Sequence, residues 1–281
     1  MENMLKIENV CKNYPSFSLN HINFQVPAGC IMGFIGENGA GKSTTIKLIL
    51  DLIQKDSGVI EVLGQDSTKI SRDMKEHIGV VLDEANFSQE LNYKDINKIM
   101  KHLYKTWDSH KFMQMMKEGA IPPDRKFKDY SKGMKMKLSI AAAVCHDTWL
   151  LIMDEATSGL DPISREEVLD FLLEFIQDER HAVFISSHIL SDLEKVCDYI
   201  TLIHKGSIIF SEVKDELIEK YGILKCGKDE LADIDAGAII GMRENAFGTE
   251  ALVLKNRIPE GFVVDLATLD EIMLFYVKGE K

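Results

Sequence analysis

The sequence predicts an α/β fold with a parallel sheet at its centre, and three observations support this prediction. An apolar run, Cys30–Ile35, leads into a glycine-rich loop and then into a helical pattern. Between residues 149 and 196, apolar strand patterns alternate with helical patterns, which is typical of strands joined by crossover helices. With 281 residues, 45% hydrophobic and 28% charged, the chain has the composition of an ordinary soluble globular protein.

The first 82 residues predict an antiparallel β-subdomain beside the parallel strands. Met4–Val10 and Leu19–Val26 alternate apolar and polar residues, as half-buried antiparallel strands do. The helix after the glycine-rich loop is expected at Thr44–Leu50, and further strands at Gly58–Leu63 and Ile78–Leu82. We therefore expect a mixed sheet with an antiparallel β-subdomain.

From about residue 84 to residue 145 the pattern becomes helical, and strand patterns are weak. Ile96, Ile99, Met100 and Leu103 are spaced to form one apolar face of a helix. This stretch predicts a separate helical subdomain over about residues 84–145.

Strand and helix patterns return after the helical subdomain. They lie at Trp149–Met153, Ile163–Ile176, Ala182–Ser186 and Ile189–Val196. Tyr199–Ile203 and Ser207–Phe210 flank a His-Lys-Gly turn and predict a hairpin. These elements complete a domain that we place at residues 1–212.

Beyond about residue 212 the character of the sequence changes. A short charged helix, Val213–Tyr221, is followed by short strands and a final helix, Leu269–Val277. We expect residues 213–281 to form a small C-terminal α+β appendix. It carries no catalytic cluster, and packing, regulation and dimerisation are its candidate roles.

The charge and the cysteine content disfavour several classes of protein. A net charge of −12 argues against a general nucleic-acid binder. The five cysteines are scattered without a C-x-x-C pair, which fits reduced thiols in a cytosol better than disulfides or a zinc site. No segment approaches about 18 consecutive apolar residues, and the charged N-terminus lacks a signal peptide. We therefore expect a cytoplasmic protein that reaches a membrane only as a docked peripheral subunit.

Residues 36–44 hold the most informative motif. They read G-E-N-G-A-G-K-S-T and fit G-x-x-x-x-G-K-[ST], a loop whose backbone N–H groups cradle the phosphates of a nucleotide. Strand, loop and helix N-terminus together form an anion site, and Lys42 faces the β- and γ-phosphates. The nucleotide-binding residues expected in this loop are Gly36, Asn38, Gly39, Ala40, Gly41, Lys42, Ser43 and Thr44.

Two carboxylates follow the apolar strand that ends near Met153. Because ligands gather at the carboxyl ends of parallel strands, Asp154 and Glu155 are expected beside the phosphate loop. Asp154, directly or through water, and the Ser43 hydroxyl are the expected Mg²⁺ ligands. Glu155 is expected to orient and polarise the attacking water as a general base.

At this point the chain resembles the ATP-binding subunit of an ABC transporter, a P-loop NTPase. Tyr130–Met134, Y-S-K-G-M, resembles the family's signature loop L-S-G-G-Q, and Ser158–Asp161 looks like its D-loop. Ser186–His188 follows a strand as the family's switch histidine does. Tyr14 stands where the family stacks an aromatic ring on adenine. The order and spacing of these segments match over about residues 4–215.

The resemblance implies that two chains pair head to tail, each sealing ATP between its own phosphate loop and the partner's signature loop. Ser131 suits the partner's γ-phosphate because it begins a helix with a hydroxyl and free N–H groups. Gly133 permits close approach of the backbone, and Asp161 is included among the nucleotide-binding residues. His188 would hold the γ-phosphate and the attacking water.

The sequence departs from the family pattern in two places. Asp83 stands where the family usually has a Gln that reaches Mg²⁺ and the attacking water. A carboxylate is a better ligand for a hard cation than an amide, so we expect Asp83 to be a further metal ligand. In the signature loop Lys132 replaces a Gly and Met134 replaces the Gln. Lys132 either approaches the partner's phosphates or extends into solvent.

The resemblance implies an ATPase subunit that powers export through a separate integral membrane permease, with catalysis by Lys42, Glu155 and His188. A second ATP-binding subunit, identical or related, would complete the dimer, and no nucleic acid is expected. The layout resembles Gram-positive exporters of peptide antibiotics and other drugs. Two alternatives are a soluble ABC-type ATPase, disfavoured by a single cassette without sustained heptads, and a regulatory nucleotide binder, disfavoured by the presence of Glu155 and His188.

Overall fold

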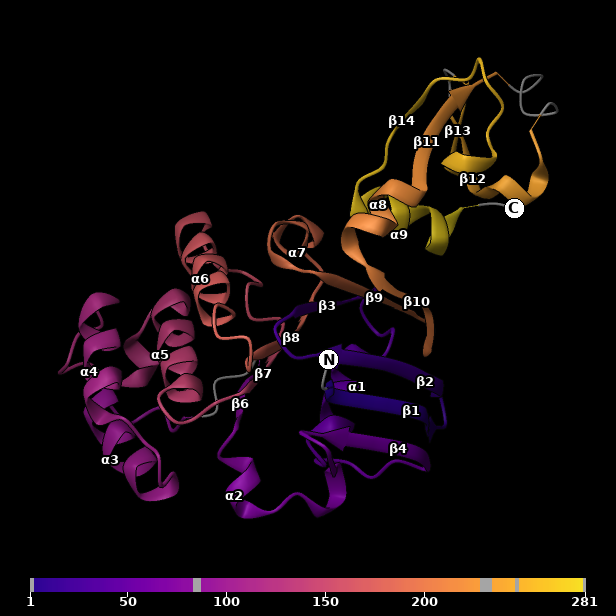
Figure 1. Ribbon diagram of the computed structural model, residues 1–281. Coiled ribbons are helices and arrows are strands. Elements are labelled where there is room, and N and C mark those ends of the chain that lie inside the picture. The colour runs from indigo at the N-terminus through magenta and orange to yellow at the C-terminus, as the bar shows by residue number, and fades with distance from the viewer. Residues whose placement is uncertain (1–2, 83–86, 228–233, 246–247, 280–281) are drawn as a thin grey trace.

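A mixed sheet lies at the centre of the computed structural model, which describes residues 3–82, 87–227, 234–245 and 248–279 (Figure 1). Its strand order is β10-β9-β3-β8-β7-β6, with β10 antiparallel to β9 and the other pairs parallel. The strands are β3 (Ile31–Ile35), β6 (Ile78–Val81), β7 (Leu150–Asp154), β8 (Ala182–Ser187), β9 (Tyr199–His204) and β10 (Ser207–Val213). The predicted α/β fold with a mixed sheet is confirmed.

The central strands are buried because both faces of the sheet are covered. Every residue of β3, β7 and β8 is buried. On one face the rings of Phe34 and Phe184 pack against Phe24, with centroids 5.4 Å from each other or less. On the other face Val183 and Ile185 belong to a cluster shared with the helices described below.

An antiparallel sheet with the strand order β2-β1-β4-β5 covers the face that carries Phe34. Its strands are β1 (Asn3–Tyr14), β2 (Phe17–Pro27), β4 (Ser57–Val62) and β5 (Gln65–Asp66). The phosphate-loop helix α1 (Lys42–Ile49) packs in the same cluster, and the short helix α2 (Arg72–Lys75) precedes β6. The expected antiparallel β-subdomain is therefore present.

The helical layer consists of α3 (Tyr93–Leu103), α4 (Ser109–Glu118) and α5 (Lys132–Val144), which Figure 1 shows beyond the β6 edge. Ile96 and Met100 are buried against α4 and α5, whereas Ile99 and Leu103 are 43% and 55% exposed. Only part of the apolar face predicted from the spacing is therefore buried.

The remaining helices of the first 212 residues are α6 (Pro162–Phe175) and α7 (Leu190–Val196). The predicted hairpin is formed by β9 and β10. Lys205 (φ +45°) and Gly206 (φ +77°) both adopt left-handed backbone conformations at its turn, as a two-residue hairpin turn of the primed type requires. The Gly206 N–H donates to the carbonyl of Ala40 at 3.0 Å, so this turn also supports the phosphate loop.

The C-terminal segment forms its own sheet with the order β12-β13-β11-β14. Its elements are α8 (Lys214–Lys220), β11 (Tyr221–Cys226), β12 (Ile239–Asn245), β13 (Gly248–Leu254), β14 (Val264–Leu266) and α9 (Leu269–Lys278). One buried cluster holds Leu193 of α7 and Cys197, which follows α7, together with Leu217, Ile272 and Phe275. Because this cluster contains residues from before and after residue 212, the division of the chain at that point stays a prediction.

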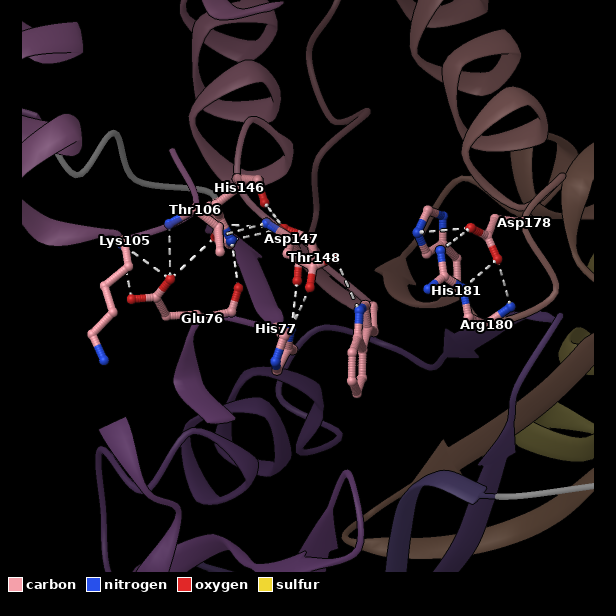
Figure 2. A network of polar contacts seen from close by, with 12 residues as sticks. Glu76, His77, Lys105, Thr106, His146, Asp147, Thr148, Asp178, Arg180 and His181 are labelled. Carbon is pink, nitrogen blue, oxygen red and sulfur yellow. Dashed lines mark hydrogen bonds and ion pairs between the residues drawn. The ribbon is translucent and has the colours of Figure 1, made fainter. Parts of the chain in front are cut away.

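A polar network ties the helical layer to the start of β6 and β7 (Figure 2). The Glu76 carboxylate accepts hydrogen bonds from the N–H groups of Lys105 (2.9 Å) and Thr106 (3.2 Å) and from the Thr106 hydroxyl (3.1 Å). His146 donates Nδ1–H to the Glu76 carbonyl at 2.7 Å, and its ring stacks on Tyr104. Burial disfavours the charge of the Glu76 carboxylate, but the hydrogen bonds from Lys105 and Thr106 outweigh this effect and lower the pKa of Glu76.

The buried His146 ring predicts how stability depends on pH. His146 is 7% exposed, and burial lowers the pKa of its imidazole below the usual value. The unfolded chain, in which histidine titrates near about pH 6.5, then binds the proton more readily than the folded chain. We expect the free energy of unfolding to be highest above about pH 6.5 and to decrease as the pH falls below this value. Urea unfolding at about pH 7.5 and 5.5 measures the difference.

In the His146→Gln variant the free energy of unfolding should decrease less between about pH 7.5 and 5.5 than in the wild type. The control His102→Gln, at an exposed position of α3, should show the wild-type decrease. Equal pH dependence in wild type and His146→Gln would contradict the assignment.

Candidate nucleotide site

The phosphate loop joins β3 to α1 and depends on glycine at two positions. Gly39 (φ +82°) and Gly41 (φ +119°) both adopt backbone conformations that side chains disfavour. A Cβ atom on Gly41 would lie 2.5 Å from Leu19 Cδ2 and 3.0 Å from the Phe17 ring. The chain can therefore make this turn against the antiparallel sheet only because residue 41 has no side chain.

The first turn of α1 presents free donors. Gly41 caps this helix without a side-chain hydrogen bond, and Thr45 donates its N–H to the Gly41 carbonyl at 2.9 Å. The N–H groups of Lys42, Ser43 and Thr44 donate to no acceptor among the residues that the structure describes. Such groups, together with the helix dipole, attract an anion. The loop thus fits a phosphate group.

Lys42 is held at this turn by carbonyl oxygens and by a carboxylate. Its side chain is only 6% exposed, and Nζ donates to the carbonyls of Gly36 at 2.7 Å and Glu37 at 3.4 Å. Nζ also lies 3.4 Å from Glu155 Oε1. The ammonium group is therefore fixed between the loop and the end of β7.

Glu155 connects Lys42 to His188. Its other carboxylate oxygen, Oε2, lies 2.6 Å from His188 Nδ1. The backbone of Glu155 is left-handed (φ +52°), a conformation that costs a non-glycine residue about 1–3 kcal/mol. Its N–H donates to both the carbonyl and the hydroxyl of Ser186 at 3.1 Å, which holds this conformation in place. Lys42, Glu155 and His188 therefore form one continuous row of polar contacts.

Asp154 is buried at the last position of β7. Its Oδ1 accepts a hydrogen bond from the Ser186 hydroxyl at 2.5 Å. β7 and β8 pair here in register, Asp154 opposite Ser186, so the same serine orients both acidic residues.

A cavity of about 670 Å³ lies over the loop, within the size range of small-molecule sites. It is lined by Ser16, Phe17, Glu37, Asn38, Gly39, Gly41, Lys42, Ser43, Thr44, Glu155, Ser158 and His188. The predicted site residues include eight of these lining residues but not Ser16, Phe17, Glu37 or Ser158, although Ser158 was assigned to the D-loop. The signal for Phe17 was the alternation of β2, which places Phe17 and Leu19 on the same face, toward Gly41.

Some predicted site residues do not line this cavity. Gly36 and Ala40 support the loop: a Cβ on Gly36 would lie 2.4 Å from the Ile203 carbonyl, and Ala40 is buried. Tyr14 is an exposed residue whose ring lies 5.5 Å from Lys12 Nζ, and its contact with adenine stays a prediction. Asp83 lies outside the residues that the structure describes.

The remaining predicted residues meet at a second place, where α5 and α6 begin. Ser131 caps α5 by accepting the Met134 N–H at 3.2 Å, and Asp161 caps α6. A Cβ on Gly133 would lie 2.5 Å from Ser164 Oγ and 3.8 Å from Asp161 Oδ2. None of Ser131, Gly133 and Asp161 lines the cavity over the phosphate loop. Lys132 is exposed and extends over Gly159, where a Cβ would lie 2.8 Å from its Nζ.

The two glycines predict a graded loss of binding. At Gly39 no described atom lies within 4 Å of an added Cβ, so Gly39→Ala adds only backbone strain, about 1–2 kcal/mol. Gly41→Ala adds the same kind of strain, a collision with Leu19 Cδ2 at 2.5 Å and tight contacts with the Phe17 and Ile203 side chains. We expect Gly41→Ala to weaken the affinity for a fluorescent ATP analogue at least about tenfold more than Gly39→Ala, equivalent to about 1.4 kcal/mol. Equal affinities in two folded variants would contradict this account of the loop.

Comparison with known proteins identifies the family. The family model described as ABC transporter matches residues 19–158. The uncharacterized ABC transporter ATP-binding protein YhcH of Bacillus subtilis (strain 168) is 30% identical over 287 residues, covering 99% of this chain and 92% of the relative. The lantibiotic transport ATP-binding protein SrtF of Streptococcus pyogenes is 36% identical over 214 residues, covering 75% of this chain and 92% of the relative.

A solved structure described as "Structure of ATP binding subunit of ABC transporter" superimposes with a TM-score of 0.68 at 25% identity. It covers 76% of this chain, and the match spans 91% of the solved chain. The chain belongs to the family of ABC transporter ATP-binding proteins.

Proposed function

We propose that this chain hydrolyses ATP as part of a head-to-tail dimer and thereby drives export through a separate membrane permease. The observation that carries the proposal is the arrangement of Lys42, Glu155 and His188 around one cavity over a phosphate loop. An anion-binding cation, a carboxylate base and an imidazole are the groups that phosphoryl transfer to water needs.

The free N–H groups of the first turn of α1 bind the triphosphate, and Lys42 neutralises its charge. In the structure Lys42 Nζ lies 3.4 Å from Glu155 Oε1. A phosphate carries more negative charge than a carboxylate, so ATP draws Lys42 away from Glu155. The carboxylate then becomes available as a general base.

Glu155 accepts the proton of the attacking water. His188 fixes the orientation of the Glu155 carboxylate through the contact between Nδ1 and Oε2. The left-handed backbone at Glu155 aims the carboxylate into the cavity rather than along the sheet. Orientation of a catalytic group in this way supplies a large part of the rate enhancement.

Mg²⁺ fits the donors at this site. Ser43 lines the cavity and Asp154 lies at the end of β7, and both offer the oxygen ligands that Mg²⁺ prefers. Within the described ranges no group of three or more acidic, histidine or cysteine side chains is placed to hold a metal ion. The ion would neutralise phosphate charge; Asp83 stays a predicted further ligand.

The proposed dimer follows from the separation of two sets of residues. Ser131, Gly133 and Asp161 lie together at the start of α5 and α6 but do not line the chain's own cavity. This supports their use on the nucleotide of a partner chain.

We propose a separate permease because the matching family model is described as ABC transporter and one relative is a lantibiotic transport ATP-binding protein. In the residues that the structure covers, no helix is long and apolar enough to cross a bilayer. The relative named for lantibiotic transport supports a peptide or peptide-like substrate. Attachment to the inner face of the membrane would occur through the permease.

Glu155→Gln tests the proposal. The variant keeps the size of the side chain but removes the base, so we expect ATP binding to persist and phosphate release to fall at least about 100-fold. ATP should then trap a dimer detectable by size-exclusion chromatography. Glu174→Gln, an exposed change on α6, is the matched control.

Turnover at the wild-type rate in Glu155→Gln would refute the base assignment. Undiminished turnover by a strictly monomeric chain would refute the proposed dimer.

A further inference from the structure

A buried acidic residue on α7 takes no part in the mechanism described so far. Asp192 is 3% exposed, and its Oδ2 accepts no hydrogen bond from any residue that the structure describes. A buried carboxylate needs a counter-charge, because desolvation of an isolated charge is very unfavourable. The cation that faces it is Arg165 of α6, with Nε 3.7 Å from Asp192 Oδ2.

Arg165 also reaches the turn that precedes α6. Its Nη2 donates to the Leu160 carbonyl at 3.4 Å. One guanidinium therefore touches both the D-loop segment 158–161 and α7. These two segments are otherwise separated in the sequence by the whole of α6 and β8.

The D-loop segment and the residues before α7 also meet at Glu155, one through its backbone and the other through its side chain. Glu155 accepts the N–H of Ser158 through its carbonyl at 3.0 Å, and its carboxylate contacts His188. His188 lies two residues before α7, and Asp192 lies in the first turn of that helix. The contacts form a closed ring, with Glu155 and His188 at the front and Arg165 and Asp192 at the back.

A second ion pair joins the same helices but differs in burial. Lys195 of α7 and Glu166 of α6 lie 2.8 Å apart, and their side chains are 54% and 56% exposed. Exposed pairs of this kind contribute little to holding a geometry. The Arg165–Asp192 pair, whose side chains are 30% and 4% exposed, is therefore the ion pair better able to hold α7 relative to the D-loop, in addition to the apolar packing of Leu160 with α7.

The buried pair also leaves a hydrogen bond unmade. Arg165 Nε, like Asp192 Oδ2, has no hydrogen-bond partner among the described residues. Unsatisfied buried groups are rare in native proteins and deserve an explanation. If α6 and α7 moved slightly closer together, Arg165 Nε could donate a hydrogen bond to Asp192 Oδ2, now 3.7 Å away.

We infer that Arg165 and Asp192 are positioning residues for ATP hydrolysis, which hold His188 against Glu155 by tying α7 to the D-loop. The inference rests on the proposed function, because the positioned groups are its base and its imidazole. Neither residue touches the nucleotide cavity.

Asp192→Asn tests the inference in the full-length chain, since it keeps the shape of the side chain and removes its charge. We expect kcat to fall about 10- to 100-fold, while KM and the affinity for ATP stay within about twofold. Glu166→Gln, which removes the exposed pair between the same helices, should leave both constants unchanged. An unchanged kcat in Asp192→Asn, or an equal fall in Glu166→Gln, overturns the inference.

Hydrogen exchange provides a readout without nucleotide. In Asp192→Asn the amides of residues 156–161 and 188–193 should exchange faster together, whereas Glu166→Gln should protect both segments as wild type does. If only one segment changes, the ring does not exist. This result stands whether or not the chain hydrolyses ATP, so it separates failure of the inference from failure of the proposed function.

A double variant separates positioning from folding. Arg165→Met combined with Asp192→Leu replaces the ion pair by apolar side chains of similar volume, which buried pairs often tolerate. We expect this variant to fold with the wild-type urea midpoint but to keep the low kcat. Full recovery of kcat would mean that the pair only fills space, and it would overturn the inference.

Discussion

The register of the parallel strands is the constraint on which the site depends. β3, β7 and β8 end at the same edge of the sheet, with Ile35 beside Ser187 and Asp154 beside Ser186. A slip of one residue between β7 and β8 would turn the acidic end of β7 to the opposite face, because side chains alternate along a strand. The aliphatic residues that fill both faces of these strands prevent that slip. Packing far from the cavity thus fixes the distance between the base and the phosphate loop.

Opposite charges lie together at this edge of the sheet. Lys42 and Glu155 are each largely shielded from solvent, and each is the counter-charge of the other, so neither is an isolated buried charge. His188 lies at the outer side of this pair and is half exposed. The proposed base and the proposed phosphate-binding cation are thus in contact, so a ligand that attracts Lys42 also changes the surroundings of Glu155.

Local motifs predicted much of this molecule, and long-range packing decided the rest. The spacing of Gly36, Gly41 and Lys42 was enough to place the loop, because such a turn admits few alternatives. The exposure of Ile99 could not be predicted, since it depends on how few neighbours surround α3. Phe17 was missed because the adenine-stacking assignment was carried over to Tyr14 from the family pattern. The left-handed backbone of Glu155 has no signature in the sequence, because Ser186 on another strand stabilises it.

The shared cluster beneath α9 has a consequence for the catalytic half of the chain. Ile272 and Phe275 of α9 pack against Leu193 and Cys197, which lie on the inner side of the helix that follows His188. In a chain that ended after residue 212, the apolar side chains of Leu193 and Cys197 would be exposed to water. Residues 213–281 therefore shield the inner side of α7 from water, and removing them would expose the apolar side chains of the helix that follows His188.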